Sequence, residues 1–206
     1  MTHPFSVRQA GVASLAAAVL ILGSQISQLV IPMVLTESFW IATQTLRMGL
    51  ALAAMFALLV AIAALYSSGV AGVGRLGLVA YLVASLGTVL IAGNWWYEAF
   101  IGPVLRVEAP DLIATAPSGS ILVAAAITSG TFAIGWALFG IASLQANVLP
   151  RRSSMLLTVA GVIGILALIS PFQIPLALVV GLVGLWLVGS DRRAADARPV
   201  PVPAAT

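Results

Sequence analysis

Residues 45–66 read TLRMGLALAAMFALLVAIAALY, and this stretch decides the fold class. After Arg47 it contains no charged residue, and it is apolar on every face of a helix. A helix that crosses a membrane needs about 20 apolar residues, because the hydrocarbon core of a bilayer is about 30 Å thick. The strands of a membrane barrel would instead alternate apolar and polar residues. The stretch therefore predicts a transmembrane helix.

The whole chain has the composition of such a segment. Of its 206 residues, 61% are hydrophobic and 7% are charged, whereas a soluble domain has about 25% charged residues. So few charges cannot cover the surface of a globule in water. The composition excludes an ordinary soluble enzyme, a disordered chain and a nucleic-acid binder, and it predicts a protein that crosses the membrane several times.

Six apolar segments are rich enough in Leu, Ala, Val and Ile to be read as helices. They predict an all-α transmembrane bundle of six helices within residues 1–190. The expected spans lie near residues 10–31, 45–66, 76–96, 121–145, 155–169 and 174–189. The last two are short, so they either extend further, thin the bilayer locally or form a hairpin buried among the other helices.

Prolines and glycines mark the expected breaks between the spans. Pro32 is expected to end the first span, and Gly102-Pro103 to open a long loop that covers residues 99–120. This loop fits an amphipathic surface segment or a lid. Residues 191–206 are polar and rich in proline, which predicts a disordered cytoplasmic tail.

The arginines predict the orientation of the chain. With a cytoplasmic N-terminus, only Arg47 and Arg106 of the nine basic residues lie outside. This distribution follows the positive-inside rule. We therefore expect a multi-pass protein of the inner (plasma) membrane, with both termini cytoplasmic. A bacterial origin is a guess from chain length and from the use of Ala, Gly and Arg.

The residue inventory excludes several kinds of chemistry. The chain has no cysteine, all its basic residues are arginines, and its only histidine is His3. Disulfides, thiolate nucleophiles and Schiff bases on lysine are therefore impossible, and no His-ligated metal site can form in the membrane within one subunit. The sequence predicts no catalytic residue, no metal and no cofactor, and hence a protein that is not an enzyme.

Polar and aromatic residues gather near the outer ends of the first three predicted helices. If these helices are neighbours, the side chains converge on an outward-facing vestibule that binds a ligand or a partner. Arg47 would be its charged anchor, paired with Glu98 or Glu37. The candidate site residues are Gln25, Gln28, Gln44, Arg47, Asn94, Trp95, Trp96, Tyr97 and Glu98.

Structural explanations compete with this interpretation. Tryptophan and tyrosine collect at membrane interfaces, glutamine bonds neighbouring helices, and arginine can extend its side chain to the surface. We therefore hold two functional hypotheses. The first is a non-enzymatic accessory or binding protein that contacts membrane lipids and associates with a second copy or another membrane protein, but not with nucleic acid. The alternative is a channel or facilitator for a neutral or lipidic molecule, since the middle thirds of the spans lack ionisable side chains.

Overall fold

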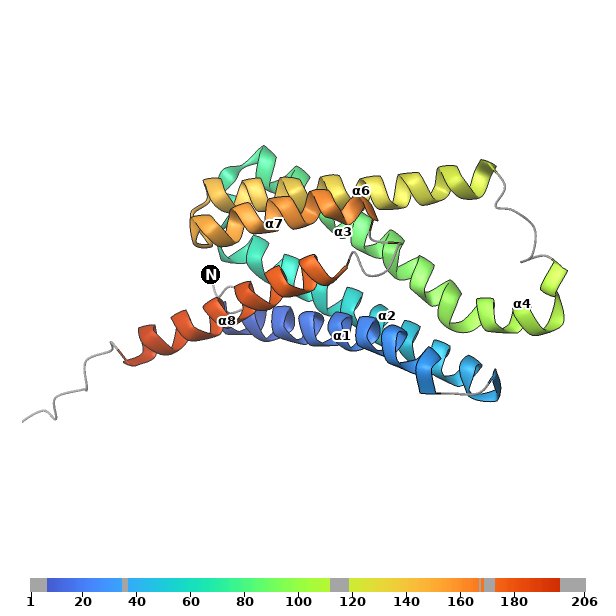
Figure 1. The fold of residues 1–206 in the computed structure, drawn as a ribbon. Coiled ribbons are helices and arrows are strands. Elements are labelled where there is room, and N and C mark those ends of the chain that lie inside the picture. The colour runs from blue at the N-terminus through green and yellow to red at the C-terminus, as the bar shows by residue number, and fades with distance from the viewer. Residues whose placement is uncertain (1–6, 35–36, 112–118, 167, 169–172, 197–206) are drawn as a thin grey trace, which may run out of the picture.

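Over the residues that the structure describes, the fold consists of helices and short turns, without strands (Figure 1). This computed structural model describes residues 7–34, 37–111, 119–166, 168 and 173–196. The helices, in chain order, are α1 (Val7–Val34), α2 (Glu37–Ser68), η1 (Val70–Val73), α3 (Arg75–Trp96), the π-helical η2 (Tyr97–Ile101), α4 (Gly102–Glu108), α6 (Gly119–Gln145), α7 (Arg151–Ile163), η3 (Gly164–Leu166) and α8 (Ile174–Asp196).

Four helical stretches are long and apolar enough to cross a membrane. They are Val7–Ser27, Thr43–Ser68, Arg75–Glu108 and Gly119–Gln145, and they correspond to the first four predicted spans. Large apolar side chains are exposed on α3, α6, α7 and α8, for example Leu82, Ile134, Val159 and Leu182. An exterior of this kind is compatible with lipid as the surrounding solvent.

The helices pack as a closed ring. Each of the six main helical stretches contacts its two neighbours, in the order α1, α2, α3, α6, α7, α8 and back to α1. Small residues allow close approach: a Cβ added at Gly184 would lie 2.8 Å from the carbonyl oxygen of Gly11, so α1 and α8 touch through their backbones. Fully buried apolar side chains such as Leu58, Ile62 and Phe132 fill the centre of the ring.

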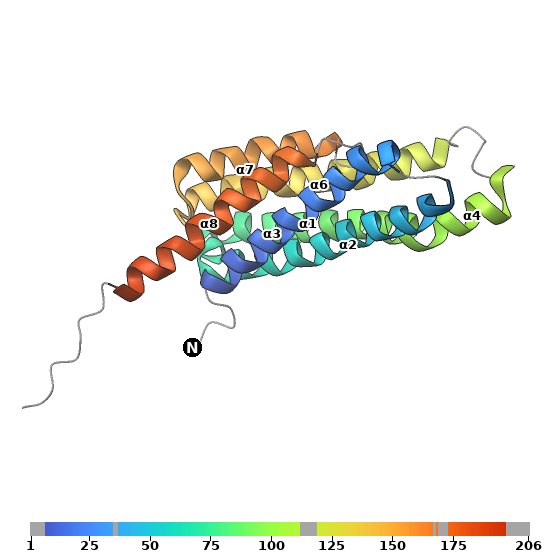
Figure 2. The ribbon, with the colours of Figure 1, turned by 60° about the horizontal axis from the view of Figure 1, so that its bottom comes forward.

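The last two helices do not run the full length of this ring. In both views, the end of η3 and the start of α8 lie part-way along the bundle, whereas α6 continues well beyond them (Figures 1 and 2). The apolar part of α8, Ile174–Ser190, is shorter than the four long helices. The predicted sixth span extends further than expected, to Asp196, and the large apolar side chains exposed on α7 and α8 disagree with a hairpin buried among the other helices.

Several predicted boundaries were wrong. The helix α1 passes Pro32 and ends two residues later, at Val34. The predicted fifth span ended at residue 169, but α7 ends at Ile163 and η3 at Leu166. The predicted disordered tail began at residue 191, but α8 continues to Asp196; residues 197–206 lie outside the described residues.

The largest correction concerns the loop predicted over residues 99–120. The chain stays helical to Glu108, and residues 112–118 lie outside the described part. Pro103 lacks an N–H and crowds the carbonyl four residues earlier, that of Ala99. The π turn η2 absorbs this disturbance, with the Gly102 N–H donating to the Tyr97 carbonyl. The hydroxyl of Thr45 on α2 donates to the freed Ala99 carbonyl at 3.2 Å.

We expect Thr45→Val to lower the free energy of unfolding by about 1 kcal/mol, because the hydroxyl's hydrogen bond to the Ala99 carbonyl is lost. In a Pro103→Ala background, the new N–H at position 103 can donate to that carbonyl, so the same valine substitution should cost much less. A double-mutant cycle of unfolding free energies in mixed micelles measures the difference. Equal costs in the two backgrounds would contradict this explanation of the helix continuing past Pro103.

Candidate functional site

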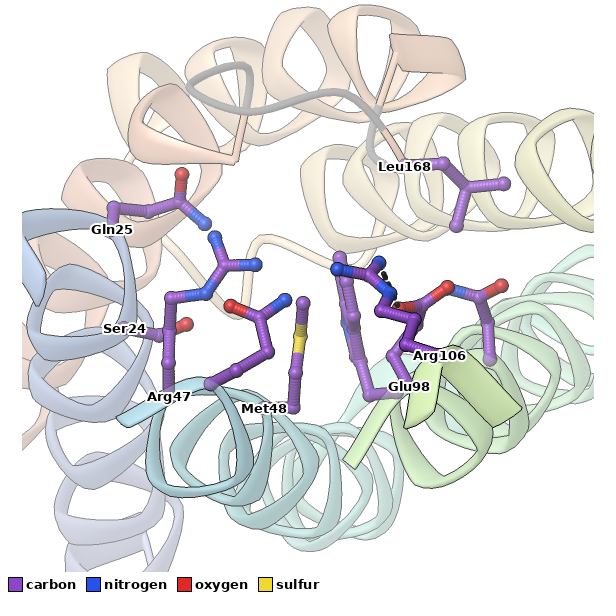
Figure 3. A pocket seen from close by; sticks show the side chains of 10 residues that line it. Ser24, Gln25, Arg47, Met48, Glu98, Arg106 and Leu168 are labelled. Atoms are coloured by element: carbon purple, nitrogen blue, oxygen red, sulfur yellow. Dashed lines mark ion pairs between the residues drawn. The ribbon is translucent and has the colours of Figure 1, made fainter. Parts of the chain in front are cut away.

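A partly open cavity of about 300 Å³ lies beside the outer parts of α1, α2 and α3 (Figure 3). Here "outer" denotes the end of the bundle that contains α4. The lining side chains come from these three helices, from the π turn and α4, and from the segment after η3. They are Ser24, Gln25, Gln44, Arg47, Met48, Asn94, Trp95, Glu98, Arg106 and Leu168.

The cavity exists because the hairpin stops short. At one end of the bundle six helices close the ring, whereas beyond the end of η3 only the four long helices continue (Figures 1 and 2). Leu168, directly after η3, is one of the lining residues. The space that α7 and α8 would fill if they ran the full length is therefore left partly open.

Arg47 is the central cation of the site. It lies in the first part of the long apolar stretch of α2, and its guanidinium points across the cavity toward the side chain of Gln25 (Figure 3). The Nε atom of Arg47 is buried and has no hydrogen-bond partner. A buried donor without an acceptor costs about 1–3 kcal/mol, so this guanidinium is available for an acceptor that enters the cavity.

A second arginine faces the same cavity from α4. Arg106 forms an ion pair with Glu98, with 3.9 Å between Nη2 and Oε2 (Figure 3). Two turns of α-helix take about 7.2 residues, and a π turn holds one residue more. The π turn between them therefore returns Arg106, eight residues later, to the face of Glu98. The predicted partner of Arg47 was Glu98 or Glu37; the ion pair formed by Glu98 is with Arg106, and the side chain of Glu37 lies outside the described residues.

The cavity lining carries a formal charge of +1, because two arginines and one glutamate contribute to it. Both ends of the Glu98–Arg106 pair are partly exposed, with 30% and 38% of their side chains accessible. Such a pair contributes little to stability, but within the cavity lining it leaves Arg47 as the charge without an ion pair. The arrangement favours a group with negative charge.

Gln25 connects α1 to the hairpin. Its side-chain amide donates to the Oε1 atom of Gln173, just before α8, at 3.5 Å. Both glutamines are 4% exposed. The bond crosses between the first and last helices of the ring, so Gln25 both lines the cavity and helps to hold the end of the hairpin beside it.

The aromatic cluster divides into one inward and two outward residues. Trp95 lines the cavity, is 8% exposed, and has a buried indole N–H without a hydrogen-bond partner. Trp96 and Tyr97 are 50% and 42% exposed and do not line the cavity. Trp96 instead packs against Phe100, with ring centroids 6.0 Å apart. For these two residues, the expected place in the site was wrong, and the alternative of an interfacial aromatic belt fits their exposure.

Six of the nine predicted site residues line the cavity: Gln25, Gln44, Arg47, Asn94, Trp95 and Glu98. The side chain of Gln28 lies outside the described residues. The lining residues that were not among the candidates are Ser24, Met48, Arg106 and Leu168. Arg106 could have been included if the helix had been continued past Pro103, whereas no sequence signal points to Leu168.

The described side chains contain no group of three or more His, Cys, Asp or Glu residues that could hold a metal ion. The chemistry that the cavity offers is therefore recognition by two guanidinium groups, an indole and the side-chain amides.

Comparison of the chain with protein-family models, with curated proteins and with solved structures gave no match.

Proposed function

We propose that this chain is a non-enzymatic binding protein of the plasma membrane, and that it holds a negatively charged group in an outward-facing cavity. The observation that carries the proposal is a cavity lining of charge +1, in which Glu98 pairs with Arg106 and the Arg47 side chain has a buried donor without a partner. An incoming oxyanion would balance the charge and accept from the Arg47 guanidinium, and charge-assisted hydrogen bonds of this kind are the strong ones. The absence of cysteine, and the place of His3 before the first apolar segment, support the non-enzymatic part.

The proposed topology places both termini in the cytoplasm, with α7 and α8 as a hairpin that enters and leaves on the cytoplasmic side. Arg8, Arg75, Arg151 and Arg152 are exposed and lie at or near the starts of α1, α3 and α7. These three helices begin at the end of the bundle opposite α4 (Figure 1). The positive-inside rule then directs the cavity outward.

The packing of the bundle favours binding over passage through the protein. On α3, Thr88 and Ile91 are fully buried, and they lie between the cavity residue Asn94 and the cytoplasmic start of the helix. The Thr88 hydroxyl accepts a hydrogen bond from Trp136 Nε1 at 3.2 Å, which fixes the large indole in the centre of the ring. A channel or facilitator would need an opening at the level of Thr88, Ile91 and Trp136, where these buried side chains lie.

A cysteine at position 44 tests the proposal, because the natural chain has no thiol. On intact cells, we expect Gln44→Cys to react with an impermeant methanethiosulfonate that carries a sulfonate. Each reagent's rate with this cysteine is first divided by its rate with a free small thiol. The normalised rate of the sulfonate reagent should then be about tenfold higher than that of the trimethylammonium reagent. One unit of cavity charge at a distance of several ångströms changes the energy of each charged reagent by about 0.7 kcal/mol, with opposite signs for the two reagents, which is a factor of about ten in their relative rates.

Gly72→Cys is the matched control for the proposed orientation. Gly72 is exposed in η1 and has no atom within 4 Å of an added Cβ, so the substitution should be tolerated. We expect its thiol to react only after the cells are permeabilised. If residue 72 but not residue 44 is labelled on intact cells, the orientation is opposite to the one proposed. Equal normalised rates for the two reagents at residue 44 would refute the preference for anions.

A further inference from the structure

An apolar groove adjoins the cavity. It has a volume of about 290 Å³ and lies between α6 and the end of the hairpin. Its lining residues are Ala125, Ala126, Ser129, Ile165 and Leu168. Leu168 also lines the polar cavity, so the two spaces share this lining residue. A cationic cavity and an apolar groove thus lie next to each other.

We infer that the ligand is an anionic lipid, with its phosphate head group in the cavity and an acyl chain along the groove. This inference rests on the proposed function, since it identifies the class of molecule that the same cavity binds. The head group would accept from the Arg47 guanidinium, and the chain would cover the small side chains Ala125 and Ala126. A soluble anion would occupy only the cavity and not the groove.

The surroundings of the groove give a lipid direct access. Ile121, Leu122 and Val123 on α6 are each about 60% exposed, at 59%, 60% and 59%. Three consecutive residues of a helix point in directions about 100° apart, so the start of α6 is open on most of its circumference. In a bilayer these faces contact acyl chains, and a lipid can enter sideways between α6 and the end of the hairpin.

The charges favour an anionic over a zwitterionic head group. A zwitterionic lipid brings a quaternary ammonium together with its phosphate, and the lining carboxylate that could receive this cation is Glu98. That carboxylate already pairs with Arg106. The ammonium would therefore lie near two arginines with little compensation, whereas an anionic head group meets a net positive lining.

The test measures equilibrium binding of three probes to the full chain in a neutral maltoside detergent. The probes are lysophosphatidylglycerol, lysophosphatidylcholine and glycerol 3-phosphate. We expect the anionic lysolipid to bind at least tenfold more tightly than either of the other two. Arg47→Gln should weaken the binding of lysophosphatidylglycerol and of glycerol 3-phosphate by about tenfold.

Two tryptophan substitutions on α6 separate the groove from the cavity. Ala126→Trp fills the groove. It should weaken the binding of lysophosphatidylglycerol about tenfold without changing the affinity for glycerol 3-phosphate. Ile134→Trp is the matched control, because Ile134 is 59% exposed on the same helix and does not line the groove. This substitution should change the affinity for neither probe.

Each outcome is decisive. If glycerol 3-phosphate binds as tightly as the lysolipid and Ala126→Trp has no effect, the lipid inference is overturned while anion binding in the cavity stands. If the two lysolipids bind equally, the anionic class is wrong. If Arg47→Gln changes the affinity for none of the three probes, the proposed function itself fails.

Discussion

Gly135→Ala is expected to lower the free energy of unfolding by about 3 kcal/mol, which is within the range found when a packed interior is overfilled. A Cβ at position 135 would lie 2.5 Å from both N and Cα of Ala84 on α3. These are backbone atoms, so no side-chain rotation can relieve the overlap, and α3 and α6 must move apart. The same contact is tight from the other side, where a Cβ at Gly87 would lie 2.6 Å from the Phe132 nitrogen.

Gly130→Ala is the matched control on the same helix. No atom lies within 4 Å of a Cβ added at Gly130, and alanine is more favourable than glycine in a helix by about 1 kcal/mol. The control should therefore unfold at the same temperature as the unaltered protein or at a higher one. Thermal unfolding in detergent, followed by circular dichroism, measures both variants. Equal stability of the two would show that α3 and α6 do not meet at Gly135.

The long helices could be predicted from the sequence because only length and apolar composition are needed to find them. The convergence of Gln25, Arg47 and Glu98 could be predicted for a related reason. Polar groups are costly in lipid, so residues at the same ends of antiparallel neighbours gather at one level. Four of the predicted spans therefore correspond to long apolar helices, and six of the nine candidate residues line one cavity.

The inward and outward faces of these helices could not be predicted. In a soluble helix the polar face marks the solvent, but in lipid the outer and inner faces are both apolar. Trp95 and Trp96 are adjacent in the sequence and look alike there, although one lines the cavity and the other is half exposed. Only the packing of α3 against its neighbours distinguishes them.

The continuation of the helix past Pro103 also could not be predicted from the sequence. A proline after a glycine usually marks a break, and here the helix continues because a residue distant in the chain compensates. The Thr45 hydroxyl meets the Ala99 carbonyl across 54 positions of sequence. As a result, Arg106 returns to the cavity from a segment that was predicted to be a loop.

Substitutions at position 47 in the Gln44→Cys background have the largest expected effect on the cavity. Arg106 and Glu98 cancel formally, so the lining charge is set by residue 47: +1 for arginine, 0 for glutamine and −1 for glutamate. Each step should change the energy difference between the anionic and cationic reagents by about 1.4 kcal/mol, a factor of about ten in their relative rates. Arg75→Glu is the control, because Arg75 is exposed at the start of α3 and does not line the cavity.

The relative rate of the sulfonate and trimethylammonium reagents at residue 44 is therefore the measurement that tests the positively charged, outward cavity most directly. On intact cells the predicted ratio is about ten with Arg47, about one with Arg47→Gln and about one tenth with Arg47→Glu. Arg75→Glu should leave the ratio at about ten. A ratio that stays constant across the three residues at position 47 would contradict the assignment of Arg47 as the anion-binding group of this cavity.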